Sequence, residues 1–187
     1  MNDLFERPEL QVFAGPNGSG KSTITCTFPI VGEYINADDI QKEEGIDAST
    51  AAKFATALKN YYIDERKSFT FETVLSSQYN LDIIAKAKVS GYIITIVYVI
   101  TNDPNINVGR VRNRVINGGH DVPEEKIRSR YTKSIENIKY VFKMADNFVL
   151  IDNSGAKPQL LLDKSSQEIR FFENDLWPMK SIQALIQ

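Results

Sequence analysis

A chain of 187 residues has the usual length of one domain, and its content of 42% hydrophobic and 25% charged residues excludes wholesale disorder. The net charge of −2 and the pI near 5.5 argue against non-specific binding along a nucleic-acid backbone. Cys26 is the single cysteine, so no internal disulfide can form, and the longest apolar run, Tyr92 to Ile100, is far shorter than the roughly 20 residues that span a bilayer. The N-terminus lacks a signal-peptide pattern. We therefore expect one cytoplasmic domain over residues 1–187 with no membrane partner.

Short runs of β-branched residues alternate with amphipathic stretches, which is typical of a parallel sheet covered by helices. Strands are expected at residues 10–14, 33–36, 68–71, 92–100 and 147–151. The continuously apolar strand at 92–100 is expected to be central. Helices are expected at residues 21–28, 39–44, 49–66, 78–89, 104–117 and 122–145. The last segment, about 158–187, predicts an edge hairpin followed by a C-terminal helix.

Two of these helices carry more detailed expectations. The spacing of Phe54, Leu58, Tyr61 and Tyr62 predicts that these side chains share one apolar face of helix 49–66. At the start of helix 122–145, Asp121 lies three residues before Glu124, which is the spacing of a capping box.

A glycine-rich segment follows the first expected strand and matches the P-loop pattern G-x-x-x-x-G-K-[ST] at every fixed position. Its backbone N–H groups and the next helix N-terminus are expected to hold the phosphates of a nucleotide, with Lys21 facing solvent in the empty protein. The Ser22 hydroxyl is expected to bind Mg²⁺. The absence of a guanine-recognising N-K-x-D pattern favours ATP over GTP. The expected nucleotide-binding residues are Gly15, Pro16, Asn17, Gly18, Ser19, Gly20, Lys21, Ser22 and Thr23.

Carboxylates follow two of the expected strands, at the sheet edge where α/β proteins bind ligands. Asp38 is the candidate general base that accepts the proton of an acceptor hydroxyl, with Asp39 as the weaker candidate. The alternative for Asp38 is a structural role as the cap of helix 39–44. Glu72 and Thr73 end the third strand and are candidate substrate-binding residues, with the water shell of Mg²⁺ as a second role for Glu72.

Basic residues concentrate between positions 110 and 133. This segment contains seven basic and three acidic residues, a local charge of +4 in a chain of charge −2. Arg110 and Arg114 are four residues apart and share one helix face. The turn at Gly118-Gly119 folds the second helix back, so that Arg128 or Arg130 can face the same space. We interpret helices 104–145 as a lid whose arginines contact transferring phosphate. A solvated, salt-bridged helix face and a nucleic-acid groove are the alternatives.

Taken together, these segments resemble the zeta-toxin-like family of P-loop kinases. The matching pieces are G-P-N-G-S-G-K-S-T at 15–23, I-N-A-D-D-I at 35–40, F-E-T at 71–73, R-V-x-x-R-x-x-x-G-G-H-D-V-P-E-E at 110–125, I-R-S-R-Y at 127–131, and Asn153-Ser154. The resemblance implies transfer of the ATP γ-phosphoryl group to a hydroxyl, which in the toxin branch belongs to a UDP-N-acetylamino sugar. It further implies a small antitoxin protein as a possible partner.

By matched position, the resemblance makes Lys21 the P-loop lysine, Asp38 the catalytic aspartate and Glu72 the substrate-contacting glutamate. Arg114, with either Arg128 or Arg130, falls in the lid that supplies the family's phosphate-binding arginines. The resemblance covers residues 8–155.

The sequence thus predicts an α/β protein, a three-layer P-loop kinase-type sandwich with a mostly parallel five-stranded core sheet and a helical lid. ATP and Mg²⁺ are the expected cofactors, and a small molecule with a hydroxyl group is the expected acceptor. Two alternatives remain open, a polynucleotide or RNA-end kinase and a nucleotide-binding switch without catalysis.

Overall fold

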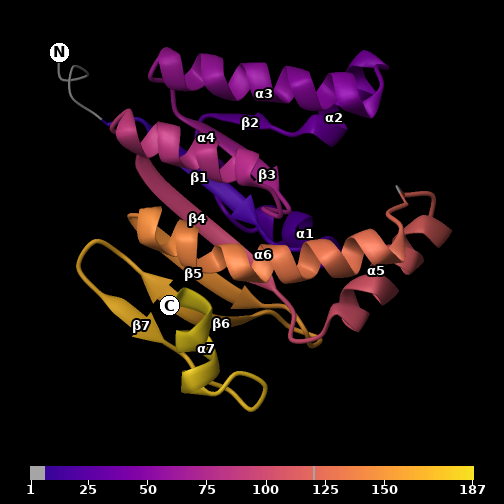
Figure 1. Cartoon of the computed structure of the whole chain (residues 1–187), viewed down its shortest axis with the longest axis vertical. Helices are drawn as coiled ribbons and strands as arrows, with labels where there is room; N and C mark the ends of the chain where they lie inside the picture. Colours follow the sequence, from indigo (N-terminus) through magenta and orange to yellow (C-terminus); the bar gives the residue numbers. More distant parts are fainter. Residues whose placement is uncertain (1–6, 120) are drawn as a thin grey trace.

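The computed structural model describes residues 7–119 and 121–187, and its centre is one sheet with the strand order β2-β3-β1-β4-β5-β6-β7 (Figure 1). Strands β2, β3, β1, β4 and β5 run parallel, and β6 and β7 add the antiparallel edge hairpin expected from the sequence. The five parallel strands confirm the predicted core, which the hairpin extends to seven strands. Their bounds are β1 Glu9–Ala14, β2 Glu33–Ile35, β3 Phe69–Thr73, β4 Ile93–Ile100, β5 Asn147–Asp152, β6 Gln159–Lys164 and β7 Ile169–Phe171.

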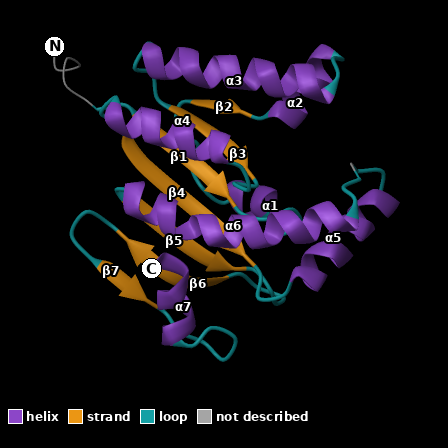
Figure 2. Ribbon diagram, viewed as in Figure 1, coloured by secondary structure: helices purple, strands orange, loops and turns teal. Residues whose placement is uncertain are grey.

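The helices cover the two faces of this sheet unequally (Figure 2). Side chains of α3, α4, α6 and α7 join the large apolar cluster on one face, and α1 closes a smaller cluster around Phe13 and Val97 on the other. None of the helices in the described part of the chain is long and apolar enough to cross a membrane. The bounds are α1 Lys21–Thr25, α2 Ala37–Glu44, α3 Ala48–Asp64, α4 Gln78–Val89, α5 Pro104–Ile116, α6 Glu124–Met144 and α7 Met179–Ile186.

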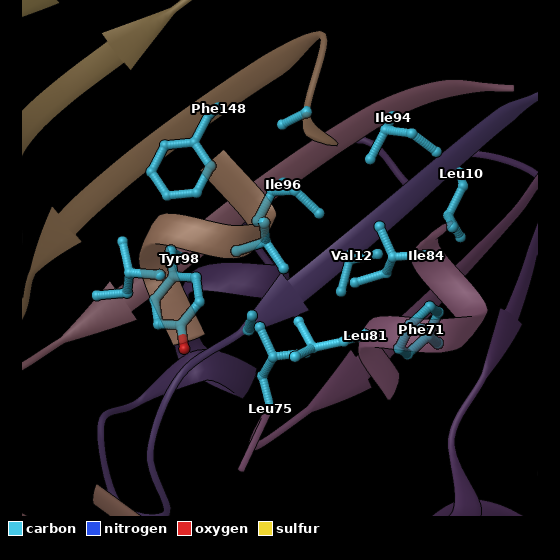
Figure 3. Close-up of a cluster of buried hydrophobic side chains, with 14 of the residues drawn as sticks. Leu10, Val12, Phe71, Leu75, Leu81, Ile84, Ile94, Ile96, Tyr98 and Phe148 are labelled. Atoms are coloured by element: carbon cyan, nitrogen blue, oxygen red, sulfur yellow. The ribbon is translucent and has the colours of Figure 1, made fainter. Parts of the chain in front are cut away.

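Strand β4 occupies the middle of the sheet, as its continuous apolar run predicts. Ile94 and Ile96 of β4 pack beside Leu10 and Val12 of β1 in the larger cluster, and all four side chains are fully buried (Figure 3). Because the parallel strands end at one edge, their C-terminal residues and the loops that follow them form the region that carries the site described below.

The predicted apolar face of α3 is wrong in part. Phe54 and Tyr61 are about half exposed, whereas Lys59 is buried. The Lys59 ammonium lies 4.3 Å from the centroid of the Phe71 ring, and burial lowers the pKa of this lysine to about 8. The small Ala55 lies one turn before Lys59 on the buried face, so this face admits a long, flexible side chain beside small ones.

The predicted capping box of α6 is also wrong. The helix begins at Glu124 after Pro123, which occupies the cap position without a side-chain hydrogen bond. The Glu124 carboxylate pairs instead with Arg112 on α5 and with Arg128 one turn further along α6. The Glu124 carboxylate, which was expected to accept a hydrogen bond from the helix backbone, therefore links α5 to α6.

Candidate active site

A cavity of about 460 Å³ lies beyond the C-terminal ends of β1 and β3 and extends to α5. Its lining joins three segments that are far apart in the sequence: the P-loop with α1, the ends of β2 and β3, and the first lid helix. The lining residues are Asn17, Gly18, Gly20, Lys21, Ser22, Thr23, Asn36, Ala37, Asp38, Glu72, Thr73, Val74, Arg110, Val111 and Arg114. Most of the predicted site residues therefore meet around one cavity.

The P-loop has the geometry of an anion-binding cradle. A Cβ atom on Gly15 would lie 2.0 Å from the Val99 carbonyl oxygen, and one on Gly18 would lie 2.5 Å from the Asn107 carbonyl oxygen. Both glycines have positive φ angles, 143° and 75°, and only glycine adopts these angles at such close approach without strain. The side-chain oxygens of Asn17 and Ser19 are buried without a hydrogen-bond partner. Such a loop at a helix N-terminus fits a phosphate group.

Lys21 is half-buried and its ammonium is bound to the protein, which corrects the expectation that it faces solvent. Its ammonium folds under the loop and donates hydrogen bonds to the carbonyl oxygens of Gly15, at 2.8 Å, and Pro16, at 3.0 Å. Burial lowers the pKa of Lys21 to about 8, although the negative charge of Glu72 acts in the opposite direction. In this position the ammonium lies next to the backbone N–H groups of the P-loop and is hydrogen-bonded to the loop's own carbonyl groups.

Glu72 connects the end of β3 with the P-loop helix. One carboxylate oxygen accepts a hydrogen bond from the Thr25 hydroxyl at 2.7 Å, and the other accepts one from the Ser22 hydroxyl at 3.3 Å. Hard oxygen ligands such as this hydroxyl and carboxylate suit Mg²⁺, which also keeps waters and substrate phosphates in its shell. The described residues contain no cluster of three or more His, Cys, Asp or Glu side chains, so any ion here would depend on those additional ligands.

Asp38 lies in the first turn of α2 and its side chain is not the helix cap. The cap is Asn36, whose side-chain oxygen accepts a hydrogen bond from the Asp38 N–H at 2.9 Å. Asp38 lines the cavity with an exposed carboxylate, whereas Asp39 is not among the lining residues. The structural alternative for Asp38 is therefore wrong, and its carboxylate remains available for chemistry.

The two lid helices divide the predicted arginines into two groups. Arg110 and Arg114 of α5 both line the cavity, and a guanidinium nitrogen of Arg110 lies 3.5 Å from the Ser19 carbonyl oxygen. Arg128 donates hydrogen bonds to Glu124 and to the side chain of Asn105, and neither Arg128 nor Arg130 lines the cavity. Val108, Val111 and Ile127 form a small apolar core between the two helices.

Sequence reasoning missed the asparagine that holds the P-loop from the lid side. Asn107 on α5 is fully buried, accepts a hydrogen bond from the Thr101 hydroxyl and donates one to the Asn17 carbonyl oxygen at 2.7 Å. On the other side, Asn153 donates to the Ser19 carbonyl oxygen at 2.7 Å. The sequence signal for Asn107 was its place one turn before Val111 on the apolar face of the expected helix, because a polar group on such a face needs a partner.

Comparison with known proteins agrees with this geometry. The family model described as Zeta toxin matches residues 2–176. The chain belongs to the zeta toxin family. A relative from Haemophilus influenzae, described as an uncharacterized protein, is 30% identical over 126 residues, which cover 64% of this chain and 89% of the relative.

Solved structures share the fold at low sequence identity. The AvrRxo1-ORF1:AvrRxo1-ORF2 structure with sulphate ions has a TM-score of 0.71 and 14% identity, covering 96% of this chain and 64% of that one. The PezAT toxin-antitoxin system of Streptococcus pneumoniae has a TM-score of 0.58 and 16% identity, covering 97% and 79%. The chain thus spans less than two thirds of its AvrRxo1-ORF1 neighbour. Family and fold together are those of zeta-toxin-type P-loop kinases.

Proposed function

We propose that this zeta toxin family member is an ATP-dependent kinase that transfers the γ-phosphoryl group to a hydroxyl of a small molecule. The observation that carries the proposal is the single cavity in which the P-loop, Asp38, Glu72 and the arginines of α5 meet. Phosphoryl transfer depends mainly on positioning and electrostatic stabilisation, and these residues provide both around one space.

The donor half of the site consists of the P-loop and α5. The backbone cradle holds the phosphates, and the Lys21 ammonium leaves its loop carbonyls to bridge the β and γ groups. Arg110 and Arg114 contact the group in transfer, where negative charge is spread over its oxygens. Ser22, with Glu72 beside it, would hold Mg²⁺, and this ion when bound neutralises phosphate charge.

The acceptor half lies at the ends of β2 and β3. Asp38 accepts the proton of the attacking hydroxyl, while Glu72 and Thr73 hold the acceptor from the adjacent wall. Burial, and then the charge of Glu72, raise the pKa of Tyr34, so its hydroxyl stays protonated beside this wall. A UDP-N-acetylamino sugar is the acceptor that the family resemblance suggests. The polar side chains that line this half of the cavity, such as Asn36 and Thr73, suit a ligand with many hydroxyl groups.

The polynucleotide-kinase alternative has less support. The positive charge of the lid is partly neutralised, because Glu124 pairs with both Arg112 and Arg128. An RNA groove needs unpaired cations along its length. A solved RNA repair complex, Pnkp1/Rnl/Hen1, shares the fold at a TM-score of 0.57 and 18% identity, and this likeness extends to the fold alone.

A small antitoxin protein is a proposed partner on the basis of family. The PezAT neighbour is described as a toxin-antitoxin system, and the AvrRxo1 neighbour as an ORF1:ORF2 complex. If this chain is toxic when expressed alone, co-expression of a cognate partner is expected to restore growth. A catalytically inactive variant is expected to leave growth unaffected.

A transfer screen tests the proposed function. Purified protein receives Mg·ATP labelled in the γ-phosphate together with UDP-N-acetylglucosamine, nucleosides or a 5′-hydroxyl RNA, each separately. We expect label in the UDP-sugar fraction. Label in the RNA fraction would support the polynucleotide-kinase alternative, and ATP consumption that no acceptor increases would support a nucleotide switch.

A further inference from the structure

The turn after β3 is the most constrained part of the acceptor wall. Leu75 is fully buried with a positive φ of 53°, a backbone conformation that residues other than glycine rarely adopt. Its N–H donates to the Thr73 hydroxyl at 2.9 Å, and Asn80 at the start of α4 donates to the same oxygen at 2.9 Å. Such a conformation persists only where the surrounding structure fixes it.

The surrounding structure is α6, in the turns that follow Arg130. The Ser134 hydroxyl donates to the Val74 carbonyl oxygen at 2.7 Å, and the Asn137 side chain donates to the Leu75 carbonyl oxygen at 2.9 Å. These two bonds hold consecutive carbonyl groups of the turn. We call Ser134 and Asn137 the turn clamp.

Tyr98 of β4 supports the clamp from below. Its hydroxyl donates to the Ser134 carbonyl oxygen at 2.6 Å and lies 2.9 Å from the Ser134 hydroxyl oxygen. Tyr98 and Ser134 are both fully buried, and the Tyr98 oxygen lies within an apolar cluster that includes Leu75 (Figure 3). Removal of one member of such a buried network leaves the other polar groups without hydrogen-bond partners, which costs stability. The network therefore holds Tyr98, Ser134 and the turn in one conformation.

The clamped turn belongs to the cavity. Thr73 and Val74 line it, and Glu72 precedes them on the same strand. The clamp residues themselves are not among the lining residues, and the P-loop has separate supports at Asn107 and Asn153. A loosened turn would therefore displace the acceptor wall and leave the nucleotide cradle in place.

We infer that Ser134 and Asn137 are positioning residues for the acceptor: they set acceptor affinity through the turn at 73–75 without touching either substrate. The inference rests on the proposed function, because it takes the wall from Glu72 to Val74 as the acceptor side. Tyr131 also donates to the Thr101 carbonyl oxygen at 2.6 Å, which ties α6 to the end of β4 one turn before Ser134.

Hydrogen exchange tests the clamp without any acceptor. In Ser134→Ala and in Asn137→Ala we expect faster exchange of the Leu75 amide, which donates to the Thr73 hydroxyl, and unchanged exchange in the P-loop. Ser134→Thr keeps the hydroxyl and is expected to retain protection. Ser129→Ala on the same helix is the matched control, since the Ser129 hydroxyl is exposed and bonds only to the Lys126 carbonyl oxygen. Unchanged exchange of the Leu75 amide in both clamp variants would overturn the inference.

Kinetics then test positioning, with UDP-N-acetylglucosamine as the acceptor probe. Each clamp variant is expected to raise the acceptor KM about tenfold, the effect of one lost hydrogen bond at a buried carbonyl, with an unchanged Kd for ATP. Loosened exchange with an unchanged acceptor KM would reduce the clamp to a purely structural role and overturn the inference. If the parent protein transfers nothing to this probe, the sugar acceptor of the proposed function is wrong, and exchange of the Leu75 amide alone decides whether the clamp exists.

Discussion

The affinity for ATP is expected to depend on pH, because the pKa of Lys21 in the empty protein lies close to the physiological range. Burial lowers the pKa of this lysine to about 8, and its hydrogen bonds go to the carbonyl oxygens of Gly15 and Pro16. Bound phosphates bring negative charge next to the amine and raise its pKa, because the charged form is then favoured. Above pH 8 the empty protein has lost a proton that the complex keeps, so binding of ATP takes up a proton.

The size of the effect follows from linkage. Below pH 8 affinity is constant with respect to this group, and above pH 8 it falls about tenfold, or about 1.4 kcal/mol, for each unit of pH until the pKa of the complex is reached. Isothermal titration with ATP between about pH 7 and 9.5, in buffers of different ionisation enthalpy, measures both the Kd and the protons taken up. Lys21→Arg is the matched variant, since arginine stays charged throughout this range.

We expect a Kd that rises above pH 8 in the parent and stays flat in Lys21→Arg. A parent Kd that is constant from about pH 7.5 to 9.5, with no proton uptake, would refute the assignment of the buried ammonium to the phosphate site.

Two further predictions concern stability. The pKa of Lys59 is about 8 in the folded protein, against 10.5 ordinarily, so the unfolded chain binds more protons than the folded one between these pH values. The free energy of unfolding therefore rises with pH across this window. The cost of burying the charged ammonium is fully present below pH 8. Lys59→Met is expected to stabilise the protein by about 1–3 kcal/mol at pH 7 in urea unfolding, whereas Lys53→Met, exposed on the same helix, is expected to change little. Gly18→Ala is expected to lower the Tm by several degrees and weaken ATP binding, since its Cβ would lie 2.5 Å from the Asn107 carbonyl oxygen. Gly109→Ala, with nothing within 4 Å, is the control and is expected to be neutral or slightly stabilising; equal losses in both glycine variants would contradict this.

The order of elements could be predicted because local patterns determine it. Buried parallel strands are continuously apolar, and the P-loop has a fixed spacing with a strand before it and a helix after it. The pairing of Arg110 with Arg114 on one cavity wall also follows from helical periodicity alone. These features depend on residues close together in the sequence.

The rest depends on the backbone conformation of loops and on contacts between segments that no sequence pattern relates. Lys21 was predicted to face solvent, and the P-loop spacing alone does not show that the carbonyl oxygens of Gly15 and Pro16 accept hydrogen bonds from its ammonium. Asp38 and Asn36 are residue types that cap equally well, and the extended backbone of Asn36, where the helix begins, decides between them. The sequence left open whether Arg128 or Arg130 lines the cavity, and the ion pair between Arg128 and Glu124 is a contact that the spacing alone does not distinguish from a position in the cavity. The turn clamp joins Ser134 to Val74 across 60 positions, which no local pattern reveals.

The central claim is that Asp38 is the general base, and one comparison of variants tests it directly. Asp38→Asn leaves the cap at Asn36 untouched, so stability is expected to remain that of the parent. Asp39→Asn is the control, because Asp39 is next in sequence but is not among the residues that line the cavity. The measurement is the rate of γ-phosphoryl transfer beside the Kd for ATP in the parent and both variants. We expect Asp38→Asn to lose about 10²–10⁴-fold in transfer with ATP bound normally, and Asp39→Asn to stay near the parent. Equal transfer by Asp38→Asn and the parent, with ATP bound equally well, would contradict the claim and leave Glu72 as the next candidate base.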